Sequence, residues 1–74
     1  MFREDFHGTE GLFRLHVLDH RRFLLSFEKQ GKVLVEYKPG KRTAGGLSSP
    51  YEFKSVEKLR YDFERDVEDA LRQG

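Results

Sequence analysis

The fold is decided by residues 12–37, which read LFRLHVLDHRRFLLSFEKQGKVLVEY. Large apolar side chains alternate with polar ones in three rows of this stretch, and two groups of turn residues separate the rows. The rows are Phe13, Leu15 and Val17; Phe23, Leu25 and Phe27; and Val33, Val35 and Tyr37. Alternation with a period of two is typical of a β-strand with one buried face. The stretch therefore predicts a three-stranded antiparallel meander over residues 12–38.

The turns between these rows set the register, because a slip of one residue would move a whole row to the other face of the sheet. A three-residue turn over residues 19–21 and a three-residue loop over residues 29–31 align the rows. The core pairs expected from this alignment are Phe13–Phe27, Leu15–Leu25, Val17–Phe23, Phe27–Val33, Leu25–Val35 and Phe23–Tyr37. The rows expected on the opposite, outer face are Arg14–Ser26–Leu34, His16–Leu24–Glu36 and Leu18–Arg22–Lys38.

The chain changes character on either side of the meander. A stripe of apolar residues at helical spacing predicts a C-terminal helix over residues 55–72, with Ser55 as its N-cap. The stripe consists of Val56, Leu59, Phe63, Val67 and Leu71. Residues 1–11 are expected to form an N-terminal arm and residues 39–50 a mobile, basic, glycine-rich loop, with residues 51–53 as a short edge strand. The predicted class is α+β: a single domain with a three- or four-stranded antiparallel meander and one helix packed on one face.

Composition limits the class of protein. The 74 residues carry a net charge of +1 and no cysteine, which excludes a disulfide framework and a thiolate zinc site. No apolar run is long enough to span a membrane, and the first residues lack the pattern of a signal peptide, so a cytoplasmic location is expected. Residues 29–42 hold five basic side chains against Glu36 alone, whereas residues 56–74 hold six acidic side chains against four basic ones. Such a dipolar chain is less basic overall than most nucleic-acid-binding domains.

Histidine, serine and carboxylate residues form no recognisable catalytic or metal-binding pattern. His16 and His20 are four residues apart, but on a strand and its turn, where this spacing does not bring two rings to one ion. The serines lack the context of an activated nucleophile, and the carboxylates of the predicted helix belong mostly to a solvated face. We therefore expect no enzyme activity, no cofactor, no metal and no small-molecule substrate.

The outer face of the predicted meander carries three leucines among charged side chains. An exposed apolar cluster with a charged rim is typical of a binding surface. The alternative is that Phe2 and Phe6 of the N-terminal arm fold back and cover this cluster. The leading hypothesis is a non-enzymatic protein-interaction module, such as a regulatory subunit, an inhibitor or an antitoxin-like protein, which binds a protein partner or a second copy of itself. The residues predicted to bind are Arg14, His16, Leu18, Arg22, Leu24 and Leu34.

The second hypothesis is nucleic-acid binding through the basic third strand and the loop that follows it. The residues concerned are Lys32, Lys38, Lys41 and Arg42, flanked by Arg14 and Arg22. A sheet can lay its strands in a groove of nucleic acid, and basic residues on a mobile loop can reach phosphates. The mixed charge of the outer face and its lack of aromatic side chains for base stacking favour a protein partner instead.

One segment resembles a known family. Residues 55–59, which read SVEKL and are followed by Phe63, Val67 and Leu71, are similar to the helix of HicB-type antitoxins. In that family a βββα fold, a partial form of the double-stranded-RNA-binding fold, binds a partner toxin. The resemblance covers about 20 of the 74 residues and implies a βββα arrangement with a protein-binding role. The strand motif of the family, with an acidic residue and glycine at its turn, does not occur upstream.

Overall fold

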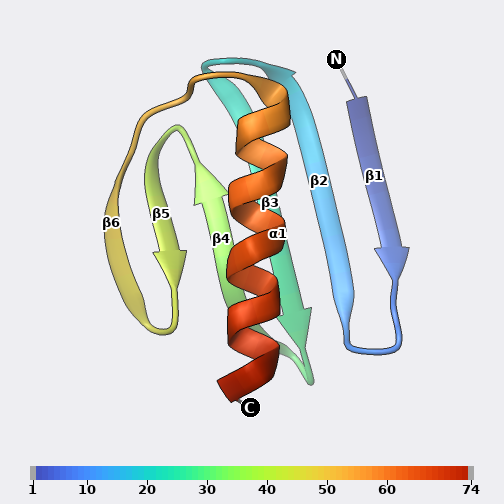
Figure 1. The fold of residues 1–74 in the computed structure, drawn as a ribbon. Helices are drawn as coiled ribbons and strands as arrows, with labels where there is room; N and C mark the ends of the chain where they lie inside the picture. Colours follow the sequence, from blue (N-terminus) through green and yellow to red (C-terminus); the bar gives the residue numbers. More distant parts are fainter. Residues whose placement is uncertain (1, 74) are drawn as a thin grey trace.

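A single antiparallel sheet of six strands, with one helix across one of its faces, forms the fold (Figure 1). The computed structural model describes the backbone of residues 2–73 and the side chains of residues 3–72. The elements are β1 (Phe2–His7), β2 (Leu12–Asp19), β3 (Arg22–Lys29), β4 (Lys32–Lys38), β5 (Gly40–Ala44), β6 (Leu47–Tyr51) and α1 (Val56–Gln73). The strands lie side by side in chain order. The α+β class and the meander are confirmed, whereas the prediction of three or four strands is too low.

The extra strands come from the two segments that were expected to be irregular. Residues 1–11 do not form a separate arm, because residues 2–7 pair with β2 along their whole length as strand β1. Residues 39–50 are not a mobile loop but most of the β5–β6 hairpin, which is joined to β4 through Pro39-Gly40. The φ angle of Gly40 is 81°, and proline followed by a left-handed glycine makes a two-residue turn. The edge strand at this end of the sheet is therefore β6, and it ends at Tyr51 instead of beginning there.

The first hairpin of the meander has the predicted core register. Phe13 pairs with Phe27, Leu15 with Leu25 and Val17 with Phe23. Only its closure differs from the prediction. Asp19 pairs with Arg22 across a two-residue turn, and Leu18 becomes the extra residue of a β-bulge.

The predicted register of the second hairpin is wrong by two residues. Gln30 and Gly31 both have positive φ, 54° and 77°, so they form a two-residue turn of type I′ in place of a three-residue loop. Leu34 is the extra residue of a bulge, because Phe27 pairs with Val35 while Glu28 pairs with Val33. Three pairs are therefore wrong: Phe27–Val33, Leu25–Val35 and Phe23–Tyr37; Leu25 faces Tyr37 instead.

The bulge also exchanges the environments of two neighbouring apolar residues. Val33, which was expected in the core, is 50% exposed. Leu34, which was expected on the outer face, is half-buried and packs against the core. A bulge reverses the facing of the residues on one side of it, so both errors have the same cause.

The core lies between the sheet and α1. Its buried members are Leu15, Val17, Phe23, Leu25, Phe27, Val35 and Tyr37 from the strands, and Leu59, Phe63 and Val67 from the helix. The helix begins where predicted, since the hydroxyl of Ser55 accepts the backbone N–H of Lys58 at 3.1 Å. No helix in the described part of the chain is long and apolar enough to cross a membrane.

Phe63 lies at the centre of the helical stripe and is fully buried. Phe63→Ala should lower the free energy of unfolding by about 3–5 kcal/mol, because the lost contacts leave a cavity in a small core. Denaturation with urea measures the change. Tyr61→Ala is the matched control, since Tyr61 is an exposed aromatic residue on the same helix. If the two variants are equally stable, α1 does not pack on the sheet through Phe63.

Candidate functional site

The face of the sheet opposite α1, the outer face, is covered by no other element within residues 2–73 (Figure 1). Residues on this face alternate along each strand with the core residues. One row across it runs through all six strands, and it contains Asp5, Arg14, Ser26, Glu36, Thr43 and Ser48. The row carries both signs of charge and no large apolar group.

Five of the six residues predicted to bind a protein lie on or beside the outer face. Leu24 is 37% exposed and pairs with His16, and Arg14 is exposed on the neighbouring row. Leu18 is 61% exposed at the bulge of β2. Arg22 follows the turn between β2 and β3. The sixth residue, Leu34, belongs to the core side, so the predicted cluster of three leucines is reduced to two.

Carboxylates within the same chain already contact some of the cationic groups. The Nε2 atom of His16 lies 2.8 Å from a carboxylate oxygen of Asp5, and this hydrogen bond is the main reason why the pKa of Asp5 is below its usual value. The guanidinium of Arg22 lies 2.7 Å from Asp19 and likewise lowers the pKa of that carboxyl group. Arg14 forms no ion pair with any residue of the described chain.

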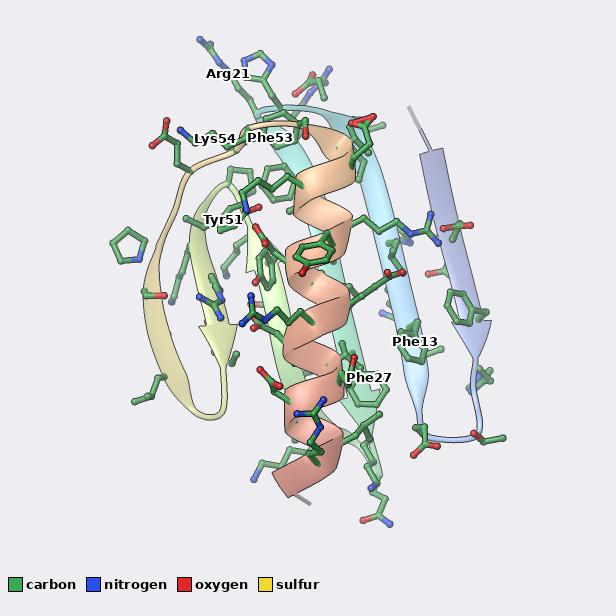
Figure 2. The ribbon with its side chains drawn as sticks, viewed as in Figure 1. Phe13, Arg21, Phe27, Tyr51, Phe53 and Lys54 are labelled. Atoms are coloured by element: carbon green, nitrogen blue, oxygen red, sulfur yellow. The ribbon has the colours of Figure 1, made fainter. Side chains whose placement is uncertain are left out.

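Phe6 does not cover the outer face. Its ring stacks on Phe13 with centroids 4.8 Å apart, and Phe13 packs against the core on the helix side. Figure 2 labels Phe13 and Phe27, which lie on neighbouring strands beside the helix. The alternative in which Phe6 folds back over the leucines therefore does not hold. The side chain of Phe2 lies outside the described part.

The residues predicted to bind nucleic acid separate into two groups. Lys32, Lys38 and Lys41 are exposed near the ends of strands. Lys38 lies directly opposite Lys41, across the turn between β4 and β5. Arg42 instead points to the helix side, where its guanidinium binds the carboxylate of Asp66.

A polar cluster of Tyr37, Arg42 and Asp66 is the functional candidate that sequence reasoning missed. The Nε and Nη2 atoms of Arg42 donate to the two oxygens of Asp66, both at 2.6 Å, which is a bidentate ion pair. The hydroxyl of Tyr37 donates to Asp66 at 2.5 Å. Asp66 is only 6% exposed, so its charge is compensated almost entirely by these two partners.

The cluster continues toward the start of α1. The hydroxyl of Tyr51 donates to Asp62 at 2.9 Å, and Lys58 contacts the other oxygen of the same carboxylate. Figure 2 labels Tyr51 on the strand side of the helix. Beside these groups is an open hollow of about 360 Å³, which is also lined by Arg65 and Asp69.

The electrostatics of this cluster suit a structural role. Burial, followed by the hydrogen bond to Asp66, raises the pKa of Tyr37, and burial and Asp62 do the same for Tyr51. The hydrogen bonds that Arg42 donates to Asp66 raise the pKa of Arg42. Both phenols are therefore protonated at neutral pH and act as donors, not as bases or nucleophiles. The Arg42–Asp66 ion pair and the Tyr51–Asp62 hydrogen bond connect the β5–β6 hairpin to the helix.

Two sequence signals could have revealed the cluster. Asp66 lies three residues after Phe63 and seven after Leu59, so helical spacing places it on the buried stripe. An acidic residue in such a stripe calls for a buried partner. Arg42 becomes that partner once Pro39-Gly40 is interpreted as a hairpin turn.

The histidines and carboxylates of the described residues are not placed as a set of metal ligands. Among the described residues, no group of three or more histidine, aspartate and glutamate side chains is placed to hold a metal ion. His16 and His20 point to different surroundings, since His16 contacts Asp5 and the ring of His20 lies 6.2 Å from that of Phe53.

Comparison with known proteins does not assign the chain to a family. No family model, no curated protein and no solved structure matches it. The likeness of residues 55–71 to the helix of HicB-type antitoxins therefore rests on the helical pattern alone. The sheet also departs from the three strands that this likeness implies.

Removing the carboxylate of the cluster should loosen the β5–β6 hairpin. Asp66→Ala leaves the buried hydroxyl of Tyr37 without an acceptor and should cost about 1–3 kcal/mol of stability. Amide hydrogen exchange should show the largest loss of protection in β5. Asp69→Ala, an exposed change one turn further along α1, should stay within about 0.5 kcal/mol of the parent. Equal protection of β5 in both variants would contradict the structural role of Asp66.

Proposed function

We propose that this chain is a small, non-enzymatic protein-interaction module that binds its partner through the outer face of the sheet. The observation that carries the proposal is the exposure of Leu24 and Leu18 on a face that no described element covers. We call these two leucines, together with Arg14, His16 and Arg22, the outer patch. Apolar side chains surrounded by charged ones on an open surface are typical of a protein contact.

The charges around the leucines favour a partner with an acidic contact surface. Arg14 has no carboxylate partner within the described chain. Lys38 and Lys41 add two cations beyond Leu24 on the same face, and Lys38 lies 3.5 Å from the carboxylate of Glu36. The helix, with its excess of carboxylates, lies on the other side of the sheet. A partner that presents an apolar side chain flanked by Asp or Glu would complement this face in both shape and sign.

The helix side of the sheet supports a non-enzymatic role. The tyrosines and acids that could do chemistry there are bonded to one another, and Tyr37 is fully buried. The hollow beside them is partly open to solvent, whereas catalytic sites usually exclude water around the reacting groups. The exposed side chains on this side include those of the solvated face of α1 and Leu47 of β6.

A second candidate, nucleic-acid binding, is favoured by one specific observation. Lys38 and Lys41 are directly opposite each other, and like charges in a cross-strand pair destabilise a sheet. A phosphate bound between them would offset that cost. Against this candidate, Arg42 is engaged by Asp66, and the Phe and Tyr rings of the described strands pack on the helix side.

A pair of matched variants tests the proposal. Leu24→Lys should abolish partner binding, because a charge at the centre of a contact is desolvated without a partner. Leu47→Lys is the control: Leu47 is 78% exposed, and its pairing with Ala44 puts it on the opposite face. The measurement is an affinity capture with the two tagged variants and the parent, followed by quantitative mass spectrometry and a nucleic-acid assay.

The outcomes distinguish the two candidates. A stoichiometric protein with an acidic contact surface, lost with Leu24→Lys and kept with Leu47→Lys, supports the outer patch. If nucleic acid is captured instead, the double variant Lys38→Ala and Lys41→Ala should flatten the dependence of log affinity on log salt by up to about two phosphate equivalents. That result, together with unchanged binding by Leu24→Lys, would end the protein-interaction proposal.

A further inference from the structure

We propose that the free edge of β1 is a pairing site for a second copy of this chain. In the arrangement we infer, two β1 strands lie antiparallel about a two-fold axis at Glu4 and join two six-stranded sheets into one continuous sheet. This inference goes beyond the proposed function, because it uses an edge of the sheet and leaves the outer patch free.

The two edges of the sheet differ in how they are protected. An edge strand presents unpaired backbone N–H and C=O groups that can pair with another chain. β6 carries Pro50, which lacks a backbone N–H, and has five residues. β1 has six residues, contains no proline and pairs with β2 without a bulge from position 2 to position 7. Within the described residues, β1 has a neighbour on one side only, so its other side is the regular open edge.

The charges along β1 select a register. With the two-fold axis at Glu4, residues 2–6 of one copy face residues 6–2 of the other, and Arg3 lies opposite Asp5 of the second copy. The symmetry forms this pair twice. Opposite charges in a cross-strand pair stabilise a sheet, whereas an edge guarded by charges of one sign would repel a copy of itself. Centring the axis on Asp5 instead would place two Asp5 carboxylates face to face.

Glu4 fits the centre of this arrangement because it has a cation beside it. Its Oε2 atom is buried without a hydrogen-bond partner, and the guanidinium of Arg60 on α1 lies 3.4 Å away. Two copies would place two Glu4 side chains at the axis with one Arg60 on each side. Each carboxylate would then have a cation close by, which offsets the repulsion between the two.

Phe6 adds an apolar contribution at both ends of the pairing. It is half-exposed although its ring stacks on Phe13, because α1 lies over β3 and β4 and does not extend over β1 (Figure 1). In the proposed register its backbone pairs with residue 2 of the second copy, so part of the exposed ring would leave water. Backbone pairing over five residues, two ion pairs and two partly covered rings suit a weak, reversible dimer.

Charge exchange tests the register directly. Analytical ultracentrifugation of the full chain, from micromolar to millimolar concentration, should show a monomer–dimer equilibrium. Arg3→Asp alone and Asp5→Arg alone should each weaken the dimer at least about tenfold, because two symmetric pairs become repulsive. The double variant, and an equimolar mixture of the two single variants, should both recover the dimer, because each restores two attractive pairs. His16→Gln is the matched control: it removes the imidazole contact of Asp5, keeps the 3.4 Å ion pair between Asp5 and Arg3 of the same chain, and should leave the dimer intact.

Hydrogen exchange of the β1 amides checks that the single variants keep β1 paired with β2. A parent chain that stays monomeric throughout overturns the proposal. Single variants that dimerise like the parent, or a mixture and a double variant that both stay monomeric, also overturn it. Self-association that is lost with Leu24→Lys but kept with Arg3→Asp would assign the contact to the outer patch instead of the edge.

Discussion

The burial of Tyr37 is the constraint on which the rest of the structure depends. Its ring is fully buried beneath α1, with centroids 6.0 Å from Phe63 and 4.9 Å from Tyr51, and its hydroxyl binds Asp66. One side chain therefore joins the apolar core to the polar cluster. It can do so because the bulge at Leu34 sets the register of β4 and brings Tyr37 opposite Leu25.

The parts of the fold that were predictable are those in which the apolar pattern admits one solution. The core register of β2 and β3 follows from alternation, and α1 follows from helical spacing and the cap at Ser55. The register of β4 was not predictable in this way. A three-residue loop and a two-residue turn with a bulge both keep the apolar rows aligned. Because Val33 and Leu34 are both apolar, the sequence does not show which of them faces the core. The strands β1, β5 and β6 lack an apolar alternation. They form through backbone pairing, glycine turns and three polar contacts to α1, which are Glu4–Arg60, Arg42–Asp66 and Tyr51–Asp62.

The face of the sheet on which each candidate binding residue lies was likewise predicted correctly only where the apolar alternation determines it. Alternation alone placed Arg14, His16 and Leu24 on one face, and the structure keeps them together. Leu34 was misplaced because its facing depends on the bulge. The Arg42–Asp66 pair was missed because it exists only when β5 lies beside β4, which requires Pro39-Gly40 to be interpreted as a hairpin turn. The carboxylate in the helical stripe was the other sign of it. Interactions between residues that only the pairing of strands brings together are the hardest to predict from a single sequence.

The rigidity of the β5–β6 hairpin changes what the basic residues near it can do. Lysines on a mobile loop would have to be ordered on binding, at a cost in conformational entropy. Lys38 and Lys41 instead extend from strands that are closed by a two-residue turn, and Arg42 and Tyr51 fasten this hairpin to α1. In the proposed function, this arrangement would hold Lys38 and Lys41 of the outer face in position for an acidic partner, while the helix, with its excess of carboxylates, lies on the opposite side of the sheet. The outer face carries carboxylates as well as cations, so the proposed attraction is local to these lysines and is compatible with a net charge of only +1.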